Sequence, residues 1–543
     1  MRLIDQKIHD FDQLRRTFQW KIPAMLNIAE QVCDRHTRQS DRPALFSENQ
    51  NGDEAVYTFG QIKSLSNRLA NALVGLGVSP GDRVAIILSQ QVETALTHLA
   101  CYKIGAIALP LSTLFGPDAL SYRLGDSGST AVVTDASQLD AIRKLQPDLP
   151  DLNIIIGVRC GKKASEFWRL LDNATDRCVG ARTRADDPAL LIYTSGTTGP
   201  PKGALVAHRA ILGNLTGFEM SHDFFPQPDD LFWTPADWAW TGGLWDALLP
   251  AWFYAKPILA YAGGKFDPEK ACHLMGKYAV RNAFIPPTAL KMMRQVPRIR
   301  KKYAVHLRSV MSAGEAVGEA LLHWGREALG LTINEMWGQT EFNYLVGNCA
   351  AIMAVRPGSM GKPYPGHGVD VIDPEGRVLP TGETGELAAQ IDDPVMFLGY
   401  WKRPEATRDK IRNGWFCTGD MGYRDDEGYL WFVGRRDDVI SSAGYRIGPG
   451  EIENCLLKHP AVLQAAVIGK PDELRGSIIK AFIVLGTDHT PTQALKEEIQ
   501  ASVRTRLAAF EYPREIEFID ALPMTTTGKI RRIELRRREG PGE

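Results

Sequence analysis

Helix-spaced apolar positions alternate with short apolar runs through the first third of the chain. Thr58 and Gln61 have capping-box spacing, and they precede apolar residues at helical intervals, at Ile62, Leu65, Leu69, Leu73 and Leu76. A second helix is predicted over residues 92–104. Strands are predicted at 84–88, 106–109, 130–134 and 153–158. Such alternation predicts an α/β fold with helix-flanked, mostly parallel sheets.

The pattern changes from about Met360, where short strands alternate with Gly and Pro turns and predict a small β subdomain. A hairpin is predicted at 425–433. Helices and strands then alternate again, at 450–458, 465–468, 479–484 and 492–507. Because 543 residues exceed what one core usually supports, we predict two domains: a large one over 1–434 and a small α/β one over 435–543.

Composition and charge exclude several classes of protein. The chain is 44% hydrophobic and 23% charged, with a net charge of −1, so it is expected to be globular and not to bind nucleic acid. No apolar run approaches the roughly 18–20 residues of a membrane helix. Eight cysteines without a Cys-x-x-Cys pair, and an N-terminus unlike a signal peptide, predict a cytoplasmic protein with reduced thiols.

One loop carries the strongest chemical signal. An apolar strand at 189–192 is followed by hydroxyl and glycine residues and then a lysine: Thr194, Ser195, Gly196, Thr197, Thr198, Gly199 and Lys202. Glycines let backbone N–H groups converge on an anion, so the loop is predicted to bind phosphates of a nucleotide. It is not a Walker P-loop, because Gly203 stands where that motif has Ser or Thr. An ordinary flexible surface loop is the alternative.

With this loop, further motifs make the chain resemble the adenylate-forming superfamily, most closely the medium-chain acyl-CoA synthetases and their bacterial relatives. They are WGQTE at 337–341, GWFCTGD at 414–420, GRRDD at 434–438, AGYR at 443–446 and PMTTTGK at 523–529. The resemblance implies that a carboxylate and ATP form acyl-AMP and pyrophosphate, and that CoA then displaces AMP. It implies Mg²⁺ as cofactor and a small C-terminal domain that rotates about Asp437.

The resemblance also assigns the nucleotide site. It places Lys202 on the β- and γ-phosphates, Thr340 on the α-phosphate, Glu341 on magnesium, Asp420 on the ribose hydroxyls and Arg435 on the ribose–phosphate region. The adenine side is formed by Gly314, Glu315, Ala316, Glu335, Met336, Trp337, Gly338 and Gln339. Structural alternatives stay open: a core aromatic for Trp337, a helix cap at 312–316, a turn at 418–420 and a solvated loop at 435–438.

For the C-terminal domain the resemblance implies two further groups. Lys529 would neutralise charge on the carboxylate and the α-phosphate in the first step. It also resembles a lysine that is acetylated in bacterial relatives, which would make an acetyltransferase and a deacetylase partners. Candidates for CoA binding are Ala443, Gly444, Tyr445, Arg446, Arg475 and Arg504.

The acyl pocket is predicted at Trp240 and Gly338. Acetate-using relatives carry Trp at the position of Gly338, so we predict room for a short-to-medium acid, including a branched or aromatic one. Phe342 and Asn343 follow Glu341 where the family usually has Thr and Gly, which leaves the pocket floor undefined. Two other functions stay open: an adenylation enzyme that loads a carrier protein, and a non-catalytic nucleotide-binding regulator. The acid and the oligomeric state are not defined by the sequence.

Overall fold

The computed structural model describes residues 2–161, 165–178, 180–194, 200–442, 445–472, 476–507, 512–525 and 529–539. Internal contacts divide the chain into two compact units. The first comprises Met1–Gly368 and Gln390–Lys410, and the second comprises Val369–Ala389 and Ile411–Glu543. Most of the strands expected in the β subdomain therefore group with the C-terminal residues, whereas those at 359–363 and 399–400 belong to the first unit. The predicted domain boundary at 434–435 and the hinge at Asp437 stay predictions.

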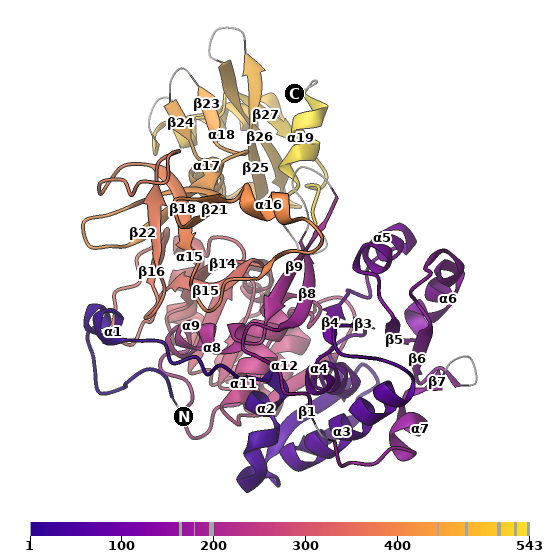
Figure 1. Ribbon diagram of the computed structural model, residues 1–543. Coiled ribbons are helices and arrows are strands. Elements are labelled where there is room, and N and C mark those ends of the chain that lie inside the picture. The colour runs from indigo at the N-terminus through magenta and orange to yellow at the C-terminus, as the bar shows by residue number, and fades with distance from the viewer. Residues whose placement is uncertain are drawn as a thin grey trace. The chain divides into compact units, whose positions relative to one another are not determined.

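The first unit contains a sheet in the order β19-β9-β8-β4-β3-β5-β6-β7. Its parallel strands are β3 (Arg83–Ile87), β4 (Ile107–Pro110), β5 (Ala131–Asp135), β6 (Ile154–Val158), β7 (Ser165–Glu166) and β8 (Pro188–Thr194). Antiparallel to β8 runs β9 (Lys202–Ala207), and β19 (Gly399–Tyr400) pairs with β9. β8 and β9 form a long hairpin, drawn in magenta in Figure 1.

Helices α3 (Phe59–Gly75) and α4 (Val92–Ile104) lie side by side in this unit (Figure 1). The predicted capping box is confirmed, because Thr58 accepts from the Gln61 backbone N–H while the Gln61 side chain accepts from the Thr58 backbone. All residues of α4 are buried. The strands predicted before residue 160 are also confirmed, with ends shifted by a residue or so.

A second sheet of this unit contains β2 (Glu54–Thr58), β1 (Pro43–Asn49), β11 (Ile258–Ala262), β10 (Phe232–Trp233), β12 (Asn282–Phe284), β13 (Ser309–Ala313), β14 (Asn334–Gln339), β15 (Phe342–Gly347) and β16 (Ser359–Pro363), in that order. Neighbours from β1 to β14 are parallel, whereas β2, β15 and β16 pair antiparallel. α12 (Pro268–Lys277), α13 (Pro287–Met293) and α15 (Gly318–Trp324) contribute to its core.

The other helices of the first unit are short. They are α1 (Phe11–Thr17), α2 (Ile28–Val32), α5 (Pro117–Ser127), α6 (Ala136–Leu145), α7 (Phe167–Asp172), α8 (Ala210–Gly213), α9 (Leu215–Ser221), α10 (Thr241–Gly243), α11 (Leu249–Phe253), α14 (Ile299–Tyr303) and α16 (Pro404–Arg408). Within the described residues, none of the helices combines the length and apolar character that a membrane-spanning segment needs.

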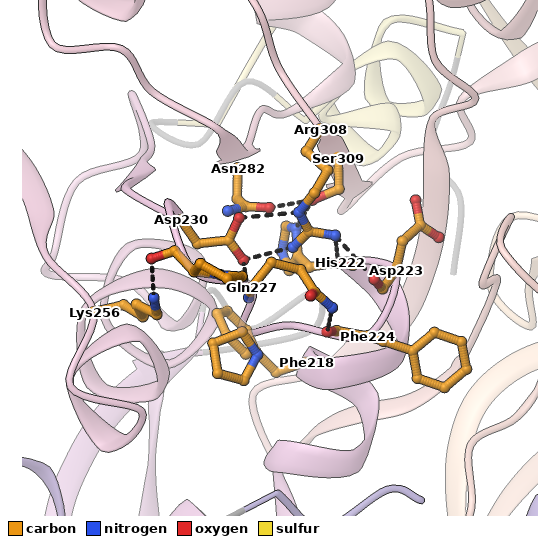
Figure 2. Close-up of polar contacts among 12 residues, drawn as sticks. Phe218, His222, Asp223, Phe224, Gln227, Asp230, Lys256, Asn282, Arg308 and Ser309 are labelled. Carbon is orange, nitrogen blue, oxygen red and sulfur yellow. Dashed lines mark hydrogen bonds and ion pairs between the residues drawn. The ribbon is translucent and has the colours of Figure 1, made fainter. Parts of the chain in front are cut away.

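A buried polar network anchors the start of β13 (Figure 2). The Arg308 guanidinium donates to both Asp230 oxygens, at 2.9 and 2.6 Å, and to the His222 carbonyl at 2.8 Å. Ser309 Oγ lies 3.0 Å from Nδ1 of His222. Burial lowers the pKa of His222 well below its usual value, so the ring is neutral. The other end of β13 leads to the predicted adenine segment, 314–316.

The second unit contains the predicted hairpin and a small α/β part. β17 (Val369–Ile372), β18 (Gly385–Gln390), β20 (Ile411–Arg412), β21 (Trp415–Arg424) and β22 (Leu430–Arg435) form an antiparallel group. The rest comprises β23 (Ile440–Ser442), β24 (Tyr445–Ile447), α17 (Pro449–Leu456), β25 (Val462–Asp472), β26 (Gly476–Leu485), α18 (Gln493–Arg504), β27 (Glu515–Phe518) and α19 (Arg532–Arg538). The predicted helices and strands are confirmed, but β25 and β26 extend well beyond the predicted runs.

Candidate nucleotide-binding and catalytic site

The predicted phosphate loop connects β8 to β9. Thr194, the last residue of β8, pairs with Lys202, the first residue of β9. Ser195 to Gly199 lie outside the described residues. Lys202 begins an antiparallel strand, whereas the lysine of a Walker P-loop leads into a helix.

Both ends of the loop are held by a polar cluster. Before the loop, the Tyr193 hydroxyl donates to Asp126 at 2.6 Å; after it, the Tyr122 hydroxyl donates to the Pro201 carbonyl at 2.9 Å. Arg403 joins the two, donating to Tyr122 Oη at 3.0 Å and to Asp126 Oδ1 at 2.9 Å. No sequence pattern connects these positions, so the cluster is visible only in the fold.

Lys202 and Glu341, two predicted catalytic residues, meet at a third side chain. The Tyr400 hydroxyl donates to Glu341 Oε1 at 2.5 Å, and Lys202 Nζ lies 5.2 Å from the centre of the Tyr400 ring. Tyr400 was not among the residues predicted from the sequence. Its relation to Lys202 depends on the pairing of β19 with the strand that begins at Lys202, which becomes visible only in the fold.

The two segments predicted on the adenine side are neighbours. β13 and β14 are parallel, with Ser312 opposite Glu335, and the chain leaves β13 through Gly314 at φ 95°. Glu335 is only 7% exposed, and its Oε2 accepts from the Val317 N–H at 3.2 Å. Burial raises its pKa to about 8. The Glu335 side chain therefore stabilises the turn that follows Gly314, because it accepts a hydrogen bond from the Val317 backbone.

The WGQTE motif forms the turn between β14 and β15. Gln339 pairs with Phe342, and Thr340 and Glu341 lie half-buried between them. The ring centres of Trp337 and Phe342 are 5.5 Å apart, so Trp337 has the aromatic contact of the structural alternative. In the neighbouring segment Glu315 is half-buried and Ala316 is exposed. Met336, which precedes the motif, is buried.

Gly338 has a local reason to be glycine. A Cβ atom there would lie 1.9 Å from the Asn343 carbonyl oxygen. The close approach of two backbones therefore excludes a side chain in this conformation, whatever the size of the acyl pocket. Trp240 is half-buried, with its ring centre 5.8 Å from that of Phe115. The acyl pocket at these two positions stays a prediction.

In the second unit, the two residues predicted to bind the ribose are paired. Asp420 on β21 and Arg435 on β22 face each other in register, and Arg435 Nη1 donates to Asp420 Oδ1 at 2.7 Å. Arg436 forms an ion pair with Glu386. Between these ion pairs and Asp438 lies Asp437, whose side chain is exposed.

Lys529 is exposed, and the three residues before it lie outside the described residues. Its backbone N–H donates to Thr525 Oγ1 at 3.0 Å, and its carbonyl accepts from the Thr525 N–H at 2.7 Å. α19 follows, and there Arg536 donates to Asp438 at 2.7 Å. The loop that carries Lys529 is thereby joined, through α19, to the GRRDD segment of the same unit.

The predicted CoA residues are scattered over the second unit. Arg504 is exposed at the end of α18, with its guanidinium 5.4 Å from the Tyr512 ring centre. Tyr445 and Arg446 belong to β24. Ala443, Gly444 and Arg475 lie outside the described residues. The structure therefore gathers no described CoA cluster.

The side chains around Glu341 show whether the site could hold a Mg²⁺ ion. No three His, Cys, Asp or Glu side chains cluster around a metal position in the part of the chain that the structure describes. One half-exposed carboxylate fits a Mg²⁺ ion that keeps waters and nucleotide oxygens in its shell, and does not fit an all-protein cage.

Comparison with known proteins gives the family. A model of AMP-binding enzymes matches residues 32–401, and a model of the AMP-binding enzyme C-terminal domain matches residues 451–529. The chain belongs to the AMP-binding enzyme family. It is an enzyme of the acid–thiol ligase class, as the adenylate-forming resemblance predicted.

Relatives extend over almost the whole chain. The mitochondrial acyl-coenzyme A synthetase ACSM3 of Rattus norvegicus is 33% identical over 552 residues, covering 99% of this chain and 94% of the relative. The acetyl-coenzyme A synthetase of Bacillus subtilis is 37% identical, covering 98% and 95%. These similarities confirm the predicted group of relatives.

Solved structures share the fold. The anthranilate CoA ligase AuaEII in complex with anthranoyl-AMP superposes with a TM-score of 0.87 at 29% identity, covering 95% of this chain and 98% of that one. ATP-bound MatB from Rhodopseudomonas palustris gives 0.84 at 29% identity, covering 94% and 98%. The predicted α/β architecture, with a large and a small domain, is confirmed at the level of fold.

Proposed function

We propose that this AMP-forming acyl-CoA synthetase acts on a short-to-medium carboxylic acid, branched and aromatic acids included. The carboxylate attacks the α-phosphate of ATP and releases pyrophosphate, and the CoA thiol then displaces AMP from acyl-AMP. The observation that carries the proposal is the meeting of Lys202, at the start of β9, with Glu341 through Tyr400. It joins a cation for phosphates to a carboxylate suited to Mg²⁺.

Neither step needs a nucleophile from the enzyme, so the residues act by neutralising charge and by positioning. Lys202 would bind the β- and γ-phosphates and Thr340 the α-phosphate. Asp420 would accept hydrogen bonds from the ribose hydroxyls. Lys529 would face the carboxylate and the α-phosphate. Mg²⁺, held by Glu341 and phosphate oxygens, would supply further positive charge.

Chain-length selectivity should be graded. Each buried methylene is worth about 0.8 kcal/mol, or about fourfold in affinity. Gly338 and Trp240 would border the acyl chain. Support for larger acids comes from the anthranoyl-AMP bound in one structural relative, and support for acetate comes from one sequence relative.

A pyrophosphate-release screen tests the acid. Acids from about C2 to C10, straight, branched and aromatic, are offered with ATP and Mg²⁺, and affinity is expected to change by about fourfold per methylene up to an optimum above acetate. A sharp optimum at acetate would contradict the assignment of Gly338. Offering a carrier protein in place of CoA distinguishes the two enzymatic functions, because acyl transfer to the carrier protein and not to CoA would support the carrier-loading alternative. If no acid leads to AMP release, the result would support the alternative of a non-catalytic nucleotide-binding regulator.

Regulation and location complete the proposal. Acetylation of Lys529 would remove its charge and stop adenylation, and an acetyltransferase and a deacetylase would then be partners. Lys529 is exposed, as modification requires. Mass spectrometry of the protein from its native cells tests this, since an unmodified Lys529 under all growth conditions contradicts it. A cytoplasmic location stays the expectation, which cell fractionation checks.

A further inference from the structure

We propose that Tyr400 is a positioning residue that keeps the Lys202 ammonium and the Glu341 carboxylate apart and ready for Mg²⁺–ATP. This inference rests on the proposed function, because that function gives both groups their roles. Tyr400 is not predicted to touch substrate. It acts through the two residues on either side of it.

The backbone around Tyr400 is tied to both catalytic segments. We name residues 397–401 the bridge segment. At its start the Phe397 N–H donates to the Glu341 carbonyl at 2.8 Å, and at its end the Trp401 N–H donates to the Gly203 carbonyl at 2.7 Å. Between them Tyr400 pairs with Ala204 of β9. The bridge segment thus fixes the distance between Glu341 and the strand that begins at Lys202.

The side chain of Tyr400 is fixed as well. It is only 8% exposed, and its ring packs edge-on against Phe397 with 5.0 Å between ring centres. The Tyr400 N–H donates to Thr407 Oγ1 at 2.9 Å. A buried ring in a packed surround has few rotamers available, so its hydroxyl and its face point in defined directions.

The ring gives each charged group a neutral partner. Glu341 Oε1 accepts from the phenol hydroxyl at 2.5 Å, while the ammonium of Lys202 lies 5.2 Å from the ring centre. The attraction of a cation to a ring face and the hydrogen bond of a phenol to a carboxylate both leave the charges in place. Both side chains belong to the described residues, and no ion pair joins them there.

Without the phenol the two opposite charges would attract each other directly. An ion pair between Lys202 and Glu341 would have to break before either group could bind Mg²⁺–ATP. In the proposal, Tyr400 disfavours this ion pair because its hydroxyl engages Glu341 while its ring face engages Lys202. The hydroxyl also fixes the orientation of the Glu341 carboxylate by donating to Oε1, and residues that hydrogen-bond to a metal ligand commonly orient it in this way.

Two variants separate the two contacts. Tyr400→Phe keeps the ring against Lys202 but removes the hydroxyl from Glu341. Tyr400→Leu removes both. A matched control is Tyr278→Phe, because the Tyr278 hydroxyl also donates to a carboxylate, Glu48 Oε2, at 2.9 Å in the same unit.

The readout is binding of a non-hydrolysable ATP analogue, measured by calorimetry with and without Mg²⁺. We expect Tyr400→Phe to raise the Mg²⁺ concentration for half-maximal binding about tenfold while Mg²⁺-free affinity stays within about twofold of wild type. Tyr400→Leu should weaken both. The Tyr278→Phe control should match wild type in both. Circular dichroism and melting temperature confirm that each variant is folded.

A wild-type Mg²⁺ dependence in Tyr400→Phe overturns the proposal, because this variant keeps the shape of the ring and is expected to fold. So does an equal loss in Tyr278→Phe. The proposed function fails on a different result: no pyrophosphate from any acid, with Mg²⁺–ATP still bound. Binding data decide the role of Tyr400 in either case.

Discussion

Arg435 donates to Asp420 across the β21–β22 hairpin, with 2.7 Å between Nη1 and Oδ1. Asp420 is only 4% exposed. Its carboxylate is therefore shielded from solvent, and the hydrogen bond from Arg435 orients it. A carboxylate accepts several hydrogen bonds at once. The pair is therefore suited to present a defined acceptor to the two hydroxyls of a ribose.

Asp420→Asn should weaken ATP binding. The amide replaces one acceptor by a donor and leaves Arg435 without an ionised partner, and hydrogen bonds to charged groups are worth about 1.5–3 kcal/mol. We expect the KM for ATP to rise roughly 10–100-fold with a smaller change for the acid, measured by pyrophosphate release. Asp373→Asn is the control, because Asp373 also pairs with an arginine, Arg377, at 2.7 Å. Equal ATP affinity in the two variants would refute the assignment.

Lys529→Gln should separate the two half-reactions. The ammonium is predicted to act on charge that develops in adenylation, so its removal should slow ATP–pyrophosphate exchange by roughly 10²–10³. Formation of acyl-CoA from supplied acyl-AMP should stay within about threefold of wild type. Arg537→Gln, an exposed neutralisation on α19, should leave both steps unchanged. Undiminished exchange in the Lys529 variant would sink the proposed role.

Glu335 should make stability depend on pH. Burial raises its pKa from 4.5 to about 8, so the folded state holds a proton that the unfolded state releases above pH 4.5. Its contribution to folding is present below pH 4.5 and is lost as pH rises through about 8. Glu335→Gln removes the ionisation. We expect its melting temperature to match wild type near pH 5 and to exceed it by about 1–4 °C at pH 9.

Differential scanning calorimetry of both proteins across that range measures the effect. Other buried acids with raised pKa values, such as Glu219 and Asp246, remain in both proteins and cancel in the difference. The exposed Glu383→Gln is the control and should show no pH-dependent difference. A constant offset for Glu335→Gln at all pH values would contradict the assignment of a protonated side chain.

Local patterns predicted the helices and strands well because each one has its own signal. Thr58 and Gln61 form their capping box in the structure, and the helix at 92–104 has the predicted ends. Strand pairing depends on contacts distant in the chain, so the sheet orders could not be predicted. β25 exceeds its apolar run because its outer residues, to Asp472, are held by pairing with β26 and not by burial.

Residues were assigned to the site by their motifs, and the structure adds the residues that hold them. Asp420 and Arg435 were both named from the sequence, and their ion pair follows from a register that no motif shows. The sequence does not predict Tyr400 and Asp126, because their contacts join segments 59 and 67 residues apart that no motif connects. Glu335 is predicted on the adenine side because it precedes the WGQTE motif. In the structure its place in β14 leaves it only 7% exposed, and its contact with the nucleotide stays a prediction.

Gly338→Ala tests whether this glycine serves the turn or the pocket. A Cβ there would lie 1.9 Å from the Asn343 carbonyl oxygen, a distance that requires backbone movement. Overpacking of this kind costs about 1–3 kcal/mol. If the backbone turn requires glycine at position 338, the variant loses stability and the KM for ATP rises for every acid alike. If the acyl pocket requires it, stability changes little and the longest acids lose the most activity.

The control is Gly75→Ala, at the end of α3, where a Cβ meets no atom within 4 Å. Alanine is a better helix former than glycine by about 1 kcal/mol, so this variant should be as stable as wild type or more so. Urea unfolding and the acid screen together distinguish the outcomes. A folded Gly338→Ala enzyme with unchanged ATP kinetics and a shortened acid range would show that the backbone yields and that the pocket explains the glycine.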